Sequence, residues 1–423
     1  MKDHGIDESG GTWYNRENNR KDGTSMSLNE TPSSERLHIA FFGRRNAGKS
    51  SVVNAVTGQP LSVVSDVMGT TTDPVYKAME LLPLGAVMIV DTAGIDDEGK
   101  LGRLRVEKSL AVLAKTDIAV LVVDGTAGMQ EADKQLVSEF EKRRLPYIIA
   151  YNKSDLTGER AAQSIHEISV SAKDGSNIRE LRELIAKQIA PETHSSPLLS
   201  DLVRVGDLIV LVIPIDESAP KGRLILPQQQ VIRAALEAGA VPVCCKDTEL
   251  AATLEKLPVP RMVITDSQAF GRVSKIVPDD VPLTSFSILF ARYKGDLLTV
   301  VQGAAALDTL QEGDKILLAE GCTHHRQCND IGTVKLPDWI RNHAGCPLEF
   351  AWSSGTGFPR DLSEYRLIVH CGACMLPPKE VQFRQRIAVE QGVPITNYGT
   401  CIAHCHGILR RSLELFPEAA ALL

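Results

Sequence analysis

The sequence lacks the features of membrane, secreted and nucleic-acid-binding proteins. Its longest apolar runs, such as Leu208–Ile213, are far shorter than the ~20 residues that span a bilayer. The polar N-terminus has no apolar core of the signal-peptide kind. The formal net charge of −7 leaves no basic excess for nucleic acid, and this acidity is too mild for a disordered acidic chain. We therefore expect a cytoplasmic protein with neither nucleic acid nor a membrane as partner.

The length and the cysteine distribution are informative. A chain of 423 residues has room for about three domains of ~150 residues, and 43% hydrophobic residues suffice for several cores. Seven of the nine cysteines lie between Cys322 and Cys405. Cytoplasmic cysteines more often bind metal or do redox chemistry than form structural disulfides. Cys244 and Cys245 end an apolar, strand-like run, and we expect them to be buried small hydrophobes.

The first part of the chain has an α/β pattern. Residues 1–35 are polar without apolar periodicity, which predicts a disordered tail. Over residues 36–190, short apolar runs alternate with amphipathic stretches, which predicts parallel strands connected by helices. The predicted strands are His38–Phe42, Val87–Val90, Ile118–Val123 and Tyr147–Tyr151, and the predicted helices are Arg103–Leu113, Lys134–Arg143 and Ile178–Ile189.

Two further regions follow a linker at Pro191–Pro197. Residues 200–280 predict a second α/β unit without a phosphate loop or an acid/base group. Its predicted strands are Leu208–Ile213, Val241–Cys245 and Met262–Thr265, and its predicted helices are Gln228–Ala238 and Glu249–Lys256. Residues 281–423 hold nearly all the cysteines and five of the ten histidines near them.

A phosphate-binding loop is the first chemical motif. Gly43-x-x-x-x-Gly48-Lys49-Ser50 follows a predicted strand and precedes the helix-like Ser51–Val56, which is the context this motif requires. Its backbone N–H groups and the helix N-terminus favour phosphate. We expect Lys49 to reach the β- and γ-phosphates and the Ser50 hydroxyl to bind Mg²⁺.

Further motifs occur in the order that a GTP site requires. Asp91-Thr92-Ala93-Gly94 follows a strand, so that Asp91 would hold Mg²⁺ through water and the Gly94 N–H would sense the γ-phosphate. Gly69–Asp73 would supply the switch threonine, Thr71, which also binds Mg²⁺.

Two more motifs are expected to bind the base of the nucleotide. Asn152-Lys153-Ser154-Asp155 ends a strand, and the Asp155 carboxylate can accept two hydrogen bonds from guanine that adenine cannot donate. Ser171-Ala172-Lys173 would close over the base. The expected catalytic residues are Lys49, Thr71, Asp91 and Gly94. The expected nucleotide contacts are Gly43, Asn46, Ala47, Gly48, Lys49, Ser50, Ser51, Thr71, Asp91, Gly94, Asn152, Lys153, Asp155, Ser171, Ala172 and Lys173.

This region resembles the translation-factor-related GTPases, in the branch of tRNA-modifying and ribosome-assembly GTPases. Ile95 stands where Ras-like proteins place a water-orienting Gln, so we expect slow intrinsic hydrolysis. Asn46 matches the Asn of potassium-activated members. The resemblance implies that Asn46 helps to hold K⁺ against the phosphates; the alternative is that Asn46 only shapes the turn.

A cysteine and histidine set lies far downstream. Cys322-x-His324 is followed, 46 positions after His324, by His370-Cys371-x-x-Cys374. Thiolates are soft ligands. The set fits tetrahedral structural zinc, and equally a [4Fe–4S] cluster on three thiolates. A redox dithiol at Cys371 and Cys374, or buried thiols without a ligand, are the remaining interpretations.

The complete pattern behind a GTPase domain resembles the [FeFe]-hydrogenase maturation GTPases of the HydF family. The resemblance implies a [4Fe–4S] cluster on Cys322, Cys371 and Cys374. It also implies a scaffold that receives a di-iron precursor from two radical-SAM maturases and delivers it to apo-[FeFe]-hydrogenase. The middle region would mediate homodimerisation. The rival interpretation is a GTPase of RNA modification or ribosome assembly with a structural zinc module.

Other candidates near the cysteines have weaker assignments. His324 is the favoured exchangeable fourth cluster ligand, and His370 is an alternative; either could instead orient a sulfur. Cys401 and Cys405 would be one helical turn apart and are either ligands or packing residues. Cys328 and Cys346 are expected to be structural.

Overall fold

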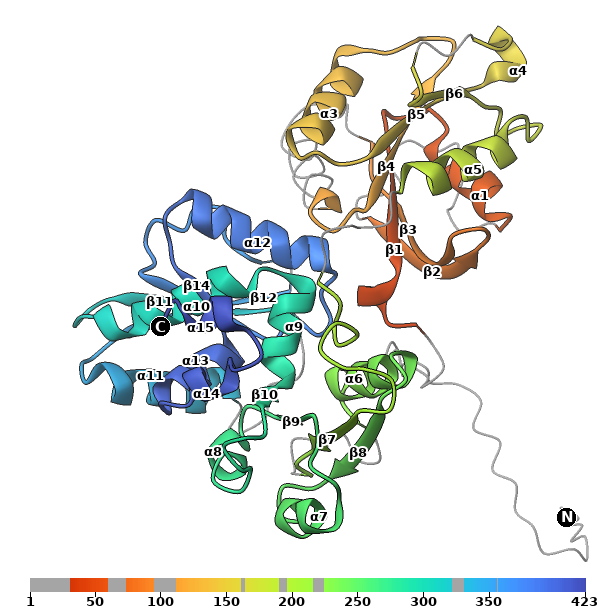
Figure 1. Cartoon of the computed structure of the whole chain (residues 1–423). Coiled ribbons are helices and arrows are strands. Elements are labelled where there is room, and N and C mark those ends of the chain that lie inside the picture. Colours follow the sequence, from red (N-terminus) through yellow and green to blue (C-terminus); the bar gives the residue numbers. More distant parts are fainter. Residues whose placement is uncertain are drawn as a thin grey trace, which may run out of the picture.

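The computed structural model of the chain describes residues 31–59, 74–94, 112–160, 164–189, 196–215, 224–321, 331–355 and 357–423. These residues form three α/β units, each built on its own sheet (Figure 1). We call residues 31–189 the first domain, 196–294 the second domain and 297–423 the third domain. The predicted α/β class is confirmed for the first two regions, and the third region proves to be α/β as well.

The first domain has a six-stranded sheet in the order β2-β3-β1-β4-β5-β6. All neighbours pair in parallel except β2 and β3. The central strands β1 and β4 consist almost entirely of buried apolar residues, because helices cover both faces of the sheet. The elements are η1 (Ser33–Glu35), β1 (Leu37–Phe42), α1 (Lys49–Thr57), β2 (Val75–Leu81), β3 (Gly85–Asp91), β4 (Ile118–Asp124), α3 (Glu131–Lys142), β5 (Tyr147–Asn152), α4 (Ser154–Thr157), β6 (Glu167–Ser169) and α5 (Ile178–Gln188).

The four predicted strands of this domain and two of its three predicted helices are confirmed. The antiparallel edge strand β2 was not predicted, because most of its side chains are exposed and it therefore carries no apolar run. Residues 33–35 of the predicted tail form η1. Residues 1–30, most of the predicted helix Arg103–Leu113 and most of the predicted linker lie outside the described residues.

The second domain has a four-stranded parallel sheet in the order β10-β9-β7-β8. Because β10 belongs to this sheet, the domain extends beyond the expected end at residue 280. The elements are β7 (Leu208–Val212), α6 (Leu226–Glu237), β8 (Val241–Cys245), α7 (Leu250–Lys256), β9 (Met262–Thr265), α8 (Phe270–Val273), β10 (Leu283–Ser285) and α9 (Phe286–Lys294).

One expectation in this domain is wrong. Cys244 is exposed and Cys245 is only partly buried, whereas both were expected in a core. The apolar sequence of β8 suggested burial, but among the described strands β8 pairs with β7 alone and is an edge strand. An edge strand leaves part of its surface open to solvent, which the local pattern does not reveal.

The third domain has a four-stranded parallel sheet in the order β12-β11-β13-β14. Its helices share a hydrophobic core with the second domain, in which Val300 of α10 and Leu409 of α14 join Ile264 and Phe286. The elements are α10 (Leu297–Ala305), η2 (Ala306–Thr309), β11 (Lys315–Glu320), the π-helical turn η3 (Ile331–Lys335), α11 (Leu336–Ala344), β12 (Glu349–Ser354), β13 (Leu367–His370), α12 (Pro378–Glu390), β14 (Ile395–Asn397), α13 (Tyr398–Cys405), α14 (Leu409–Ser412) and α15 (Pro417–Ala420).

Candidate nucleotide and metal sites

The phosphate-binding loop connects β1 to α1, as predicted. Two of its glycines are required by space as well as by backbone conformation. Gly43 has φ 144°, and a Cβ there would lie 2.2 Å from the carbonyl oxygen of Val122. Gly48 has φ 86°, and a Cβ there would lie 2.2 Å from the side-chain nitrogen of Asn152. The loop therefore packs directly against β4 and the end of β5, which leaves its N–H groups at the N-terminus of α1 for a phosphate.

Two of the residues expected to hold magnesium, Ser50 and Asp91, lie together. The Ser50 hydroxyl donates to Asp91 Oδ2 at 2.7 Å, which joins the start of α1 to the end of β3. Asp91 is 4% exposed, and its Oδ1 has no hydrogen-bond partner among the described residues. A buried carboxylate oxygen without a partner is costly. A hydrated Mg²⁺ ion would satisfy this oxygen, so the donor set fits the metal that the motif implies.

Gly94 and the side chain of Lys49 also lie against the backbone of the phosphate-binding loop. A Cβ on Gly94 would lie 3.1 Å from the backbone nitrogen of Arg45, so the end of the Asp91–Gly94 motif touches the loop. Lys49 is 9% exposed and its Nζ donates to the carbonyl oxygen of Arg44 at 3.1 Å. Thr71 and Ile95, by contrast, lie outside the described residues.

The predicted base-binding motifs meet at the ends of β5 and β6. Asn152 donates to the Ala47 carbonyl oxygen at 3.0 Å and accepts from the Ala172 N–H at 3.1 Å, so it ties these motifs to the phosphate-binding loop. Asp155 accepts from the Ser171 hydroxyl at 3.1 Å. Its other oxygen lies 3.5 Å from Lys173 Nζ. A carboxylate has about four acceptor positions, so Asp155 can still accept from a base.

Lys153 has a separate role that its motif did not reveal. It has φ 70° and its Nζ lies 2.6 Å from Asp124 Oδ2 at the end of β4. Hydrogen bonds from Lys153 and Thr126 hold the pKa of Asp124 at about 2, against the opposing effect of burial. The Lys153 side chain is thereby fixed beside the phosphate-binding edge of the sheet.

The cysteine pair of the third domain lies in the loop between β13 and α12. The Gly321 N–H donates to Cys371 Sγ at 3.0 Å. Burial raises the pKa of both Cys371 and Cys374, and neither forms a disulfide. Cys322 directly follows Gly321 in the chain but, with His324 and Cys328, lies outside the described residues. Gly321, the last described residue before Cys322, therefore contacts the Cys371 sulfur.

Lys294 fixes this loop from another domain. It is the last residue of α9 and is 1% exposed. Its Nζ donates to the carbonyl oxygens of Ala373 at 3.0 Å, Cys374 at 3.0 Å and Leu376 at 2.9 Å. Burial lowers the pKa of Lys294 to about 8, while the nearby Cys374 opposes this shift. An ammonium has three N–H donors, so all of them are used on one loop.

A segment before the first domain's sheet also reaches the loop. Ser34 in η1 is buried and its hydroxyl donates to the Cys374 carbonyl oxygen at 3.1 Å. Neither Ser34 nor Lys294 was singled out from the sequence. No spacing rule connects them to the cysteines, and Lys294 resembles an ordinary cation at a helix C-terminus.

His370 lies behind the cysteine loop and its ring has a defined tautomer. Arg384 Nη1 is an obligate donor and lies 3.0 Å from His370 Nε2, so the ring proton is on Nδ1 and is donated to the Cys371 carbonyl oxygen at 2.8 Å. Burial lowers the pKa of His370 to about 4. Both ring nitrogens are engaged, which leaves none for a metal in this arrangement.

Cys401 and Cys405 lie one turn apart on α13, as the conditional prediction required. Cys401 is fully buried in the core of the third domain, and Cys405 and Cys346 pack against the same core. A hydrogen bond between the two thiols raises the pKa of Cys401 and lowers that of Cys405. This packing favours the structural interpretation for both residues.

Comparisons with known proteins agree with this organisation. Residues 38–153 match the family described as 50S ribosome-binding GTPase. The tRNA modification GTPase MnmE of Laribacter hongkongensis is 32% identical over 171 residues, which cover 39% of this chain and 37% of that protein. GTPase Der of Maridesulfovibrio salexigens is 39% identical over 157 residues, which cover 33% of this chain and 34% of that protein. The chain therefore spans about a third of the length of these relatives.

A solved structure, Aquifex aeolicus Era bound to GDP and AlF₄⁻, aligns with a TM-score of 0.33 at 20% identity and covers 56% of this chain and 97% of that one. At this level the alignment carries no argument about function. None of the helices in the described residues has the length and apolar content that a membrane crossing requires.

Most of the chain after the GTPase match is covered by two models specific to one family. The hydrogen maturase F dimerization domain matches residues 198–295, and the hydrogen maturase F tetramerization domain matches residues 298–415. Together these two matches cover about half of the chain and lie C-terminal to the GTPase match. The chain belongs to the hydrogen maturase F family.

Proposed function

We propose that this GTPase is a scaffold that carries a [4Fe–4S] cluster on Cys322, Cys371 and Cys374. It receives a di-iron precursor from two radical-SAM maturases and transfers it to apo-[FeFe]-hydrogenase, with GTP controlling the exchange. The observation that carries the proposal is the hydrogen bond that the Gly321 N–H donates to Cys371 Sγ. Because Cys322 is the residue after Gly321, this bond supports a site that all three cysteines share. N–H bonds to sulfur are a typical means of tuning protein-bound clusters.

The donor chemistry fits such a cluster. Thiolates select soft centres, and Cys371 and Cys374 are free thiols in one loop. Lys294 places a positive charge beside them, which favours a thiolate-bound, negatively charged centre. When bound, the cluster would supply an iron whose fourth position exchanges ligands. His324 is our candidate for that position.

Hydrolysis of GTP follows from the first domain. The phosphate-binding loop and Lys49 hold the phosphates, and Ser50 and Thr71 hold Mg²⁺. Asp91 holds a water on the metal through the carboxylate oxygen that has no partner within the described part of the chain. Asp155 selects guanine. Because Ile95 offers no side-chain hydrogen bond to the attacking water, hydrolysis is slow.

We assign K⁺ binding to Asn46. This residue is exposed on the phosphate-binding loop with φ 61°. Asn tolerates this conformation better than most residues, so turn formation alone is the competing explanation. A K⁺ ion held there would neutralise charge that develops on the phosphates during hydrolysis.

Contacts between the first and third domains provide a route for nucleotide control. The guanidinium carbon of Arg143, at the end of α3, lies 5.5 Å from the ring centre of Phe383 in α12. Lys115 interacts electrostatically with Glu380 on the same helix. Since α12 begins four residues after Cys374, a change in the first domain can reach the cysteine loop. GTP would thus shift docking of the maturases or hydrogenase rather than drive cluster chemistry.

Anaerobic purification tests the cluster. We expect brown protein that bleaches in air and holds iron and sulfide. Cys371→Ala should abolish the [4Fe–4S] spectrum after reconstitution, whereas Cys346→Ala, a cysteine at the edge of the same domain's core, should retain it. Full iron and sulfide in Cys371→Ala would contradict the assignment, and colourless protein holding zinc would favour a structural zinc module.

A further inference from the structure

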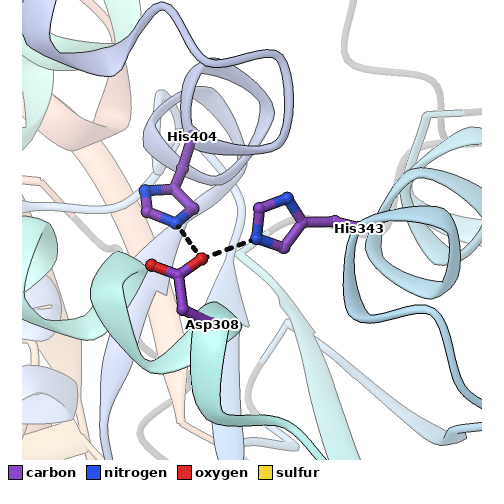
Figure 2. A group of neighbouring side chains, drawn as sticks. All are labelled: Asp308, His343 and His404. Atoms are coloured by element: carbon purple, nitrogen blue, oxygen red, sulfur yellow. Dashed lines mark hydrogen bonds and ion pairs between the residues drawn. The ribbon is translucent and has the colours of Figure 1, made fainter.

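Three polar side chains from separate segments of the third domain converge away from the cysteine loop (Figure 2). Asp308 lies in η2, His343 in the last turn of α11 and His404 in the last turn of α13. The Nε2 atoms of His343 and His404 lie 2.8 Å and 2.9 Å from the same oxygen, Asp308 Oδ1. None of the contacts described above for the nucleotide site or the cysteine loop involves these three residues.

The spacing suits a single metal ion. The three candidate ligand atoms, one from each side chain, all lie within 4.8 Å of one another. In a tetrahedral site with bonds of ~2.0 to 2.1 Å, ligand atoms are roughly 3.3 Å apart. Small side-chain rotations would therefore place all three around one ion. Each histidine would then carry its ring proton on Nδ1 instead of Nε2.

The local charge also favours a cation. Both histidines lie at helix C-termini, where the backbone carries partial negative charge, and the two ends meet at a carboxylate. The Asp308 carboxylate accepts from both histidines through one oxygen, which leaves its other oxygen and its negative charge available to a cation. The Asp308 side chain is 57% exposed, which keeps the site open to solvent.

We propose that Asp308, His343 and His404 form a mononuclear site for a first-row divalent metal ion such as Zn²⁺ or Fe²⁺. Two imidazoles and one carboxylate suit these ions, whereas Mg²⁺ and Ca²⁺ prefer oxygen ligands and Cu(I) prefers thiolates. Three protein ligands leave at least one position for water. The bound ion would join η2, α11 and α13. This site is independent of the proposed cluster.

Cobalt is the probe for this site. The full-length chain carrying Cys371→Ser and Cys374→Ser is titrated with Co²⁺, so that the cysteine loop does not compete. We expect about one Co²⁺ per chain, with visible ligand-field bands and no thiolate-to-metal charge-transfer band. Asp308→Asn, His343→Ala and His404→Ala should each weaken binding by about tenfold or more. His406→Ala should bind as the parent does, because His406 stacks edge-on against Trp339 instead.

Stability provides a second measurement that does not depend on the alanine variants folding. Asp308→Asn keeps an acceptor oxygen for both histidines but loses the charge. We expect Zn²⁺ to raise the thermal midpoint of the parent and not of Asp308→Asn. The proposal is overturned if neither Co²⁺ nor Zn²⁺ binds the parent, if Asp308→Asn binds equally well, or if a charge-transfer band shows that Cys401 and Cys405 hold the metal.

Discussion

Lys294 donates a hydrogen bond to the carbonyl oxygen of Cys374, 80 positions further along the chain and in another domain. It also holds the Ala373 carbonyl, and Ala373 has φ 53°, a conformation that is unfavourable for a residue with a Cβ. Such a conformation persists only where its surroundings enforce it. Lys294 is therefore a positioning residue for the loop between the two cysteines.

Replacing Lys294 should weaken the cluster site. Lys294→Met removes one donor from each of three carbonyl oxygens in the loop. Those of Ala373 and Cys374 still accept from the Leu376 N–H and the Ser34 hydroxyl, so within the described residues only the Leu376 oxygen is left buried and unpaired, at a cost of about 1–3 kcal/mol. We expect iron to be lost to a chelator about tenfold faster than from the parent protein. Lys256→Met, an exposed lysine on α7, is the matched control. Equal rates of iron loss in both variants would remove the positioning role.

The potassium role of Asn46 can be separated from its role in the turn. Asn46→Gly keeps the positive φ but removes the side-chain amide. We expect hydrolysis by the parent to be faster in K⁺ than in Na⁺, and Asn46→Gly to lose most of this difference while retaining GTP binding. Turnover is measured as phosphate release at equal ionic strength. Equal rates of the parent in both salts would exclude a K⁺ site.

The adjacent histidines His324 and His325 form a natural pair for testing the fourth cluster ligand. His324→Ala should keep a [4Fe–4S] cluster, because three thiolates remain, but change its electron paramagnetic resonance signal and its response to added imidazole. His325→Ala should behave as the parent. A spectrum of His324→Ala identical to that of the parent would move the fourth position to another group.

Nucleotide control can be tested without disturbing the cluster. Lys49→Ala should retain the [4Fe–4S] cluster, because the proposed ligands lie in another domain, but impair hydrogenase activation when maturases and apo-hydrogenase are supplied. If Lys49→Ala loaded with precursor beforehand activates as well as the parent, GTP acts during loading. If it matches the parent when loading is included, GTP control is absent.

Acid should destabilise the first domain through His38. This histidine is 3% exposed in β1, and burial lowers its pKa to about 4 from 6.5. Between pH 6.5 and 4 the unfolded chain binds the proton and the folded chain does not, so stability falls as the pH falls through this window. Between pH 7 and 5 the free energy of unfolding of His38→Gln should fall by about 2 kcal/mol less than that of the parent.

Calorimetry of the full chain measures this effect. Adding GDP identifies which unfolding transition belongs to the GTPase domain, because only that transition shifts. His370 also has a pKa of about 4, so acid destabilises the third domain too. This effect is the same in the parent and in His38→Gln and drops out of the difference between them. Asp117 Oδ2 lies 3.9 Å from His38 Nδ1. An ion pair with Asp117 would keep the proton on His38 in the folded state, and then His38→Gln would show no advantage at pH 5.

The predictable parts of the molecule are those encoded locally. The phosphate-binding loop, Asp91 and Asp155 follow strand ends at fixed spacing, and the edge of a parallel sheet brings them together. Ser50 and Asp91 accordingly meet, as predicted. Cys244 was expected to be buried but is exposed, because its strand lies at a sheet edge. Lys294 and Ser34 reach the cysteine loop only through domain packing. No periodicity within one segment carries that information.

The hydrogen bonds from Ser34 and Lys294 to the cysteine loop bear on the order in which the chain folds and binds iron. The loop between Cys371 and Cys374 takes its shape from residues that are made before it and that belong to the first and second domains. A newly synthesised chain therefore completes this loop only after its domains have docked. Insertion of the proposed cluster would then require that the three domains have already assembled.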